Sequence, residues 1–177
     1  MTAVTDALPH PERRWTGPDA RAPKRERAVV AGAEAKFERF YRVVADLDVD
    51  KNDVRIHEAF LHDKIYDLLL MAQVTAKANG RDIIEPQDLP ITMGLQERIH
   101  EHRRMDQDGE LAPILEYLAT RPQLDLAVGA ATEARLPEIA GGLSDALARS
   151  FKIIDPDLRN PQTRHWQRAF ELFDLVL

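Results

Sequence analysis

Apolar residues recur at the spacing of an α-helix along most of this chain, and short polar stretches separate the helical segments. The first segment begins at Ala33, and its apolar face carries four large side chains, Phe37, Phe40, Tyr41 and Val44. An aspartate-rich stretch over residues 46–53 follows and supplies a loop and a capping side chain for the next helix. The pattern predicts an all-α fold.

A long helix is predicted from about residue 53 to residue 79. One apolar stripe along this helix consists of Leu61, Ile65, Leu68, Ala72 and Ala76. A second stripe consists of Tyr66, Leu70 and Val74. Because a helix that is apolar on more than one side is packed on more than one side, we expect both stripes to be covered.

A short helix follows the long one. Asn79-Gly80 is a stop signal, since glycine readily adopts the left-handed conformation that ends many helices. Pro86 suits the first turn of a new helix. Helical spacing then continues to about Arg104 through four apolar residues, Leu89, Ile91, Leu95 and Ile99. Residues 106–109, Asp-Gln-Asp-Gly, are typical of a linker.

The same order of elements returns 75 residues later. The first stripe of the long helix maps onto five apolar residues, Leu136, Ala140, Leu143, Leu147 and Phe151. A short helix is predicted around residues 111–119. The last helix carries Trp166, Phe170, Phe173 and Leu177 at helical spacing. We interpret the repeated pattern as an internal duplication.

The second copy has a weaker long helix than the first. Pro137 falls inside it and is expected to kink or divide it, because proline removes a helical hydrogen bond and its ring collides with the preceding turn. Gly141-Gly142 weakens the helix further, since glycine has a low helix propensity.

Residues 76–89, Ala-Lys-Ala-Asn-Gly-Arg-Asp-Ile-Ile-Glu-Pro-Gln-Asp-Leu, resemble the second loop of the histone fold in archaeal histones. The resemblance implies a structural ion pair between Arg81 and Asp88. Pro156 and Thr163 occupy the corresponding positions of the second copy, so the pair is not repeated there.

Residues 33–177 as a whole resemble a small uncharacterised bacterial family of tandem histone-fold proteins, a domain of unknown function. The resemblance implies two consecutive histone folds, residues 33–105 and residues 109–177, paired within one chain as an intramolecular pseudodimer. Residues 1–32 contain several prolines and few periodic apolar positions, so we predict a flexible basic N-terminal tail there. The family implies no known reaction.

Composition narrows the range of functions. The chain has no cysteine, which excludes disulfides, thiolate zinc sites and cysteine nucleophiles. It has neither a run of about 18 apolar residues nor an apolar leader, so we expect a cytoplasmic protein without membrane contact. The net charge of −6 divides into +2 over residues 1–30 and −8 over the remainder.

Sequence signatures of catalysis are missing. His57 and His62 are five residues apart and therefore lie on different faces of a helix, whereas zinc proteases need histidines four residues apart. Gly141-Gly142 lacks the flanking residues of a phosphate-binding loop. We expect a non-enzymatic protein and assign no catalytic residue, cofactor or metal.

Nucleic-acid binding is the main functional alternative. Histones that bind DNA present cations to the phosphates from their paired loops and helix ends. The loop at residues 46–53 has a net charge of −3 and the loop at residues 79–88 a net charge of −2, so we expect the core to repel DNA. Candidate phosphate contacts lie instead in the tail, at Arg13, Arg14, Lys24, Arg25 and Arg27.

Two functions follow from this pattern of charge. The first is a protein-interaction or scaffolding module with an unidentified protein partner, and it is the one we expect. The alternative is a nucleoid-associated protein that binds DNA weakly through its tail. The position of the cations distinguishes the two functions, because DNA wrapping requires cations on the loops.

Overall fold

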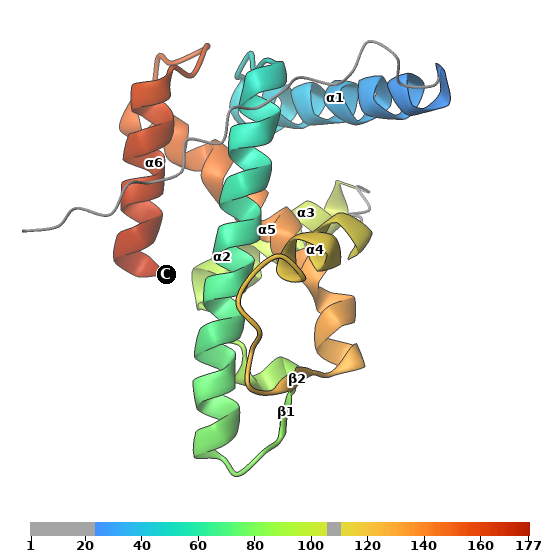
Figure 1. Cartoon of the computed structure of the whole chain (residues 1–177). Coiled ribbons are helices and arrows are strands. Elements are labelled where there is room, and N and C mark those ends of the chain that lie inside the picture. The colour runs from blue at the N-terminus through green and yellow to red at the C-terminus, as the bar shows by residue number, and fades with distance from the viewer. Residues whose placement is uncertain (1–23, 106–110) are drawn as a thin grey trace, which may run out of the picture.

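The chain is mostly helical, and the computed structural model describes residues 24–105 and 111–177 (Figure 1). The helices are α1 (Lys24–Ala45), α2 (Lys51–Ala78), α3 (Met93–Arg104), α4 (Leu111–Leu118), α5 (Ala130–Ile154) and α6 (Thr163–Val176). A short 3-10 helix, η1, spans Pro86–Asp88. The prediction of an all-α fold missed a small parallel sheet, in which β1 (Ile83–Ile84) pairs with β2 (Ala127–Val128).

Helix α1 begins earlier than predicted. It starts at Lys24, so residues 24–32 are helical, and the predicted boundary of a flexible tail at residue 32 is wrong. The residues that follow Pro23 are mainly Lys, Arg, Glu and Ala, which favour a helix even without a regular apolar face. The apolar pattern alone therefore placed the start of the helix too late.

The third helix begins later than predicted. Pro86 opens the separate η1 turn, and α3 starts only at Met93, after Pro90. Proline has no backbone N–H to donate, so Pro90 separates the two elements. The Thr92 side chain caps α3 by accepting a hydrogen bond from the Leu95 amide at 3.2 Å.

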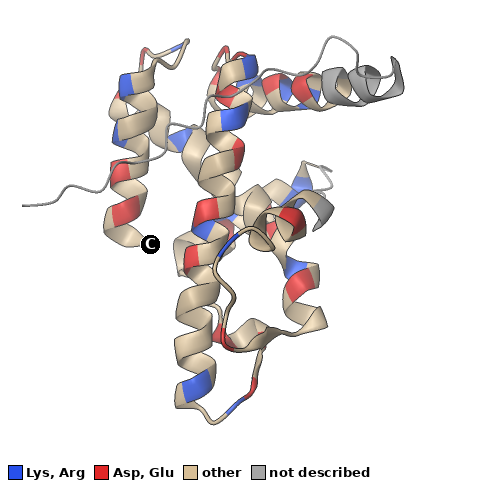
Figure 2. Ribbon diagram, in the orientation of Figure 1, with Lys and Arg blue, Asp and Glu red and all other residues tan. Residues whose placement is uncertain are grey.

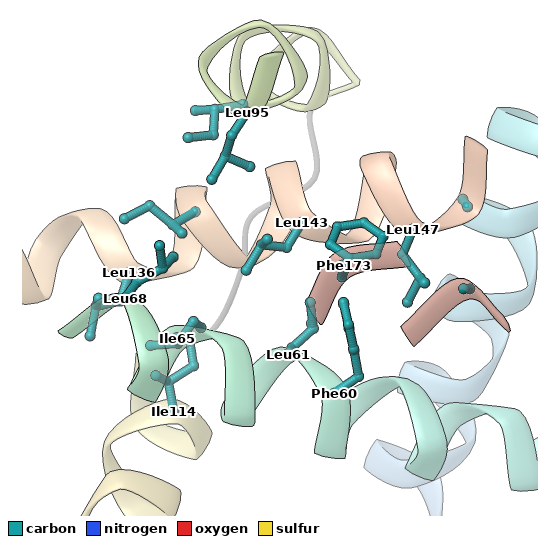
Figure 3. Close-up of a cluster of buried hydrophobic side chains, with 14 of the residues drawn as sticks. Phe60, Leu61, Ile65, Leu68, Leu95, Ile114, Leu136, Leu143, Leu147 and Phe173 are labelled. Atoms are coloured by element: carbon teal, nitrogen blue, oxygen red, sulfur yellow. The ribbon is translucent and has the colours of Figure 1, made fainter. Parts of the chain in front are cut away.

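Helices α2 and α5 form the centre of the core, with α3, α4 and α6 around them (Figure 3). The first predicted stripe of α2 and its counterpart on α5 account for much of this core. Buried residues on α2 are Leu61, Ile65, Leu68, Ala72 and Ala76, and buried residues on α5 are Leu136, Leu143, Leu147 and Phe151. Burial of these side chains is the main favourable contribution to folding.

The second stripe of α2 is largely uncovered, contrary to the prediction. Leu70 is 37% exposed and Val74 is 59% exposed. Residues 119–128 contact α2 at Tyr66 and Gln73, where the Tyr66 hydroxyl donates to the Pro122 carbonyl at 3.0 Å, and they leave Leu70 and Val74 exposed.

Of the two effects predicted for Pro137, a kink or a division of the helix, the division does not occur, because α5 is continuous through this residue. The neighbouring side chains Leu136 and Ile139 are each 1% exposed. Tertiary packing on this turn offsets the hydrogen bond that the proline removes, as it often does when local propensity and core packing compete.

Gly141 and Gly142 allow α3 to cross α5 at close range. A Cβ atom on Gly141 would lie 2.8 Å from the His102 ring carbon Cγ, and one on Gly142 would lie 2.9 Å from the Ile99 backbone nitrogen. Real Cβ atoms do not approach other atoms so closely. The glycine pair therefore has a packing role that its low helix propensity concealed.

Two contacts between loops join the halves of the chain. β1 pairs in parallel with β2, in the register Ile83 with Ala127 and Ile84 with Val128. On the other side, the Asp48 amide donates to the Arg159 carbonyl at 2.7 Å.

Candidate functional site

The first loop surface contains residues 79–88 and 119–129, on either side of the small sheet. Arg81 forms an ion pair with Asp88, whose side chain is fully buried, while the Arg81 side chain is 34% exposed. The Asp88 carboxylate also accepts a hydrogen bond from the Glu85 amide at 2.9 Å. Burial disfavours the charged carboxylate, but the Glu85 amide and the Arg81 guanidinium outweigh it and lower the pKa of Asp88.

Two further cations on this surface are paired with carboxylates of the same chain. Lys77 forms an ion pair with Asp125, and Arg121 forms one with Asp63. The Arg121 guanidinium also lies 5.6 Å from the centre of the Tyr66 ring. These charges are already engaged within the fold, so they offer little to a phosphate.

The second loop surface contains residues 46–50 and 155–160, at the other end of the paired long helices. Arg42 lies 3.5 Å from Asp48, and Arg159 lies 3.6 Å from Asp46. Lys152 donates to the carbonyls of Pro156 and Leu158 rather than pointing to solvent. Figure 2 shows acidic and basic segments side by side at both ends.

The structure separates the candidate residues into three groups. Arg81 and Asp88 lie in contact on the first loop surface. Lys24, Arg25 and Arg27 lie in the first turn of α1, at the opposite end of that helix from residues 46–50 (Figure 1). Arg13 and Arg14 lie outside the described residues.

The two histidines of α2 have different surroundings. His57 is buried, and its Nε2 atom lies 3.0 Å from the Ser144 hydroxyl of α5. The His62 ring stacks on Tyr117 with a centroid distance of 4.6 Å. Within residues 24–105 and 111–177, no three His, Asp or Glu side chains are placed to hold a metal ion.

A buried polar group also joins α2 to α6, and sequence reasoning missed it. The Trp166 indole N–H donates to Asp53 at 2.8 Å, and the Asp50 amide donates to the same carboxylate at 2.9 Å. Burial raises the pKa of Asp53, and the two hydrogen bonds oppose that effect only in part. Asp53 was recognisable as a helix-capping residue, but nothing near it in sequence indicates Trp166.

Acid is expected to destabilise the fold through His57. Burial lowers the pKa of His57 to about 3, below the ordinary value of 6.5, so the unfolded chain binds a proton that the folded chain does not. The free energy of unfolding therefore has its full value above pH 6.5, where the imidazole is neutral in both states. It decreases as the pH falls from 6.5 towards 3. Between pH 6.5 and 5 the loss is about 2 kcal/mol, since each pH unit corresponds to about 1.4 kcal/mol.

Urea denaturation at several pH values measures this effect. His57→Gln is expected to flatten the dependence of the free energy of unfolding on pH over this window. His100→Gln, at an exposed position of α3, is the matched control and is expected to leave the dependence unchanged. Equal slopes for the wild type and His57→Gln would show that the buried imidazole is not the titrating group.

Loss of the Arg81 guanidinium is expected to lower the denaturation midpoint at neutral pH, because it leaves the buried Asp88 carboxylate without its cation. The stability that Asp88 contributes is present above its ordinary pKa of 3.8 and is lost as the pH falls below it. A double-mutant cycle of Arg81→Ala with Asp88→Asn measures the coupling. Arg104→Ala, whose pair with Glu101 is largely exposed, is the control for which little change is expected.

Comparison with known proteins places the chain in a family. A family model described as a domain of unknown function, DUF1931, matches residues 37–174. The chain belongs to this family. The match runs from α1 to α6, so it includes both loop surfaces and both long helices.

Similar structures are known from two bacteria. The chain is similar to a crystal structure from Thermus thermophilus, with 52% identity, a TM-score of 0.77, and coverage of 81% of this chain and 97% of the other. It is also similar to a crystal structure from Aquifex aeolicus, with 26% identity, a TM-score of 0.69, and coverage of 81% and 94%.

A curated protein of Aquifex aeolicus strain VF5 is 30% identical over 108 residues, which cover 61% of this chain. The match spans 63% of that relative, less than two thirds of its length, and the relative is described as uncharacterised. The family description states no reaction, ligand or partner. Among the described residues, no helix has the length and apolar character needed to cross a membrane.

Proposed function

We propose that the chain is an intramolecular pseudodimer of two histone folds. Each half has three helices, of which the middle one is the longest, and these middle helices, α2 and α5, pack against each other. The loop after each long helix contacts the loop before the other, through β1 with β2 and through Asp48 with Arg159. This reciprocal exchange of loop contacts supports the pairing.

The third helices of the two halves differ in how they pack. On α3, Arg98 reaches Asp145 of α5 and Arg103 reaches Glu138, so contacts move backwards along α5 as α3 advances. On α6, Trp166 contacts Asp53 of α2, Phe170 stacks on Phe60, and Asp174 pairs with Lys64. These contacts advance in the same direction along both helices. The proposed pseudodimer is therefore asymmetric, in keeping with a divergent second copy.

We propose further that this fold acts as a non-enzymatic protein-interaction module. The observation that carries the proposal is the α2 apolar row, consisting of Leu70, Met71 and Val74, which are 37%, 52% and 59% exposed. These residues are neighbours on the helix, and Leu70 and Val74 belong to the second stripe, whose periodicity is typical of a buried surface. An exposed apolar face of this kind is typical of a surface that binds another protein.

Photocrosslinking in cells tests this proposal. A photoreactive amino acid at Met71 is expected to capture a discrete protein partner. The same amino acid at Glu97, whose side chain is 76% exposed on the polar face of α3, is the control and is expected to capture none. The proposal would be contradicted if the probe at residue 71 gave no more crosslinked product than the probe at residue 97.

The paired cations of both loop surfaces weigh against wrapping of DNA. Residues 24–177 are expected not to retard duplex DNA in a gel at physiological salt. The full chain and the fragment of residues 24–177 can be compared directly, because truncation before Lys24 leaves α1 intact. Weak binding by the full chain alone, lost steeply with salt, would support contacts from the tail.

A variant of residues 24–177 in which Lys24, Arg25 and Arg27 are changed to Gln tests the start of α1 separately. Arg164, in the first turn of α6, has no ion pair with a described residue and is a further cation to examine. Tight binding of duplex DNA by residues 24–177, abolished by Arg164→Gln, would overturn the charge argument and favour a nucleoid-associated protein.

A further inference from the structure

A pocket of about 380 Å³ lies between α2, α4, the start of α5 and the segment that joins α4 to β2. The segment runs from α4 past α2 to the small sheet (Figure 1). Buried Leu69 and Leu136 contribute the inner wall, and half-buried Leu115, Leu118, Leu124 and Leu126 contribute the outer walls. The volume and the apolar lining are typical of sites that bind small organic molecules.

The outer wall is held in place at several points. The Tyr66 hydroxyl donates to the Pro122 carbonyl at 3.0 Å, and the Leu126 amide donates to the Gln73 side chain at 3.1 Å. The segment then enters β2, where Val128 pairs with Ile84. A pocket with anchored walls loses little conformational entropy when a ligand enters.

One carboxylate on the pocket lining is left without a partner. Glu133, in the first turn of α5, is half-buried, and no described residue forms a hydrogen bond or ion pair with its side chain. The other carboxylate on the lining, Asp125, is engaged by Lys77. The neighbouring cation Arg121 is engaged by Asp63. The pocket therefore has an apolar body and a single unneutralised negative charge.

We propose that this pocket binds a small organic cation, an amine with a compact aromatic or aliphatic body. The body fills the space between the leucines, and the protonated amine donates a charge-assisted hydrogen bond to the Glu133 carboxylate. A neutral ligand of the same shape gains the apolar contacts only. An anionic ligand of the same shape is repelled. This inference is independent of the proposed protein interaction, because the α2 apolar row does not line the pocket.

The position of Glu133 in the first turn of α5 offers a second explanation for the presence of an unpaired carboxylate there. A carboxylate there interacts favourably with the N-terminal end of the helix dipole. That interaction explains why the fold tolerates the charge, but it predicts no preference among ligands. Ligand charge therefore separates the two explanations.

Calorimetric titration of the full chain with three naphthalene derivatives tests the proposal. Naphthylmethylamine is expected to bind about tenfold or more tightly than naphthylmethanol, which corresponds to one charge-assisted hydrogen bond, and naphthoate is expected not to bind. Glu133→Gln is expected to remove the preference for the amine and to leave the affinity for the alcohol unchanged. Glu116→Gln, on the exposed side of α4, makes the same change of charge without touching the lining, and the preference is expected to persist.

Leu118→Trp fills the pocket and is expected to weaken binding of both the amine and the alcohol. Should that variant fail to fold, Glu133→Gln still decides the matter, because it preserves volume. Equal affinities of the wild type for the amine and the alcohol would overturn the proposal. So would a preference that survives Glu133→Gln, or the absence of binding of both ligands at millimolar concentration.

Discussion

Residues 1–106 and residues 107–177, produced as separate polypeptides, are expected to lack a cooperative unfolding transition and to regain it when they are mixed. The cut divides surfaces that are fully buried in the intact chain. Ile84 and Ile99 lie in the first part and are 0% exposed, and the glycine pair of α5 that covers Ile99 lies in the second. Separation exposes these side chains to water, and this exposure costs about 25 cal/mol of free energy for each Å² of apolar surface.

Circular dichroism and light scattering measure the result. Each part alone is expected to be poorly helical or to associate with itself, since dimerisation is another way to cover the exposed face. Cleavage of the folded chain between residues 106 and 107, without separation of the parts, is the control and is expected to leave the transition in place. A stable monomer formed by either part alone would contradict the proposed intramolecular pairing.

Helix positions were predictable because the apolar period of a helix is a local property of the sequence. The stripe from Leu61 to Ala76 and its counterpart on α5 are buried as the pattern indicates. The coverage of Leu70 and Val74 was not predictable in the same way. Whether an apolar face is buried depends on which segment lies over it, and residues 119–128 contact Tyr66 and Gln73 but leave Leu70 and Val74 exposed.

The ends of helices were predicted less well than their positions. Local signals gave the end of α2, where Gly80 adopts a left-handed φ of 68°. They did not indicate that α5 continues past Pro137, where packing around a neighbouring buried residue offsets the local penalty. They also failed at the start of α1, where charged helix formers carry no apolar pattern.

Contacts between distant residues were beyond prediction from one sequence. The pair of Arg81 and Asp88 is separated by only seven residues, and a loop motif indicated it. His57 meets Ser144 across 87 residues, and Asp53 meets Trp166 across 113 residues. No local pattern specifies such partners. The pocket at Glu133 is of the same kind, because its walls come from four separate segments.

Gly142→Val is expected to destabilise the fold by about 3 kcal/mol, because the new side chain must displace the backbone of α3. A Cβ atom at this position would lie 2.9 Å from the Ile99 nitrogen and 3.1 Å from the Ile99 Cα. Backbone atoms of a packed helix cannot rotate away as the end of a flexible side chain can. Gly142→Ala adds the Cβ alone and is expected to give a smaller loss.

The sign of the Gly142→Ala result separates packing from helix propensity. Replacement of glycine by alanine inside a helix stabilises it by about 1 kcal/mol when nothing is in the way. Gly94→Ala provides the matched control, because no atom lies within 4 Å of the position its Cβ would take in α3. Denaturant unfolding is expected to show a gain for Gly94→Ala and a loss for Gly142→Ala. A gain at both positions would mean that α3 does not rest on the glycine pair, and the close crossing of α3 and α5 would have to be abandoned.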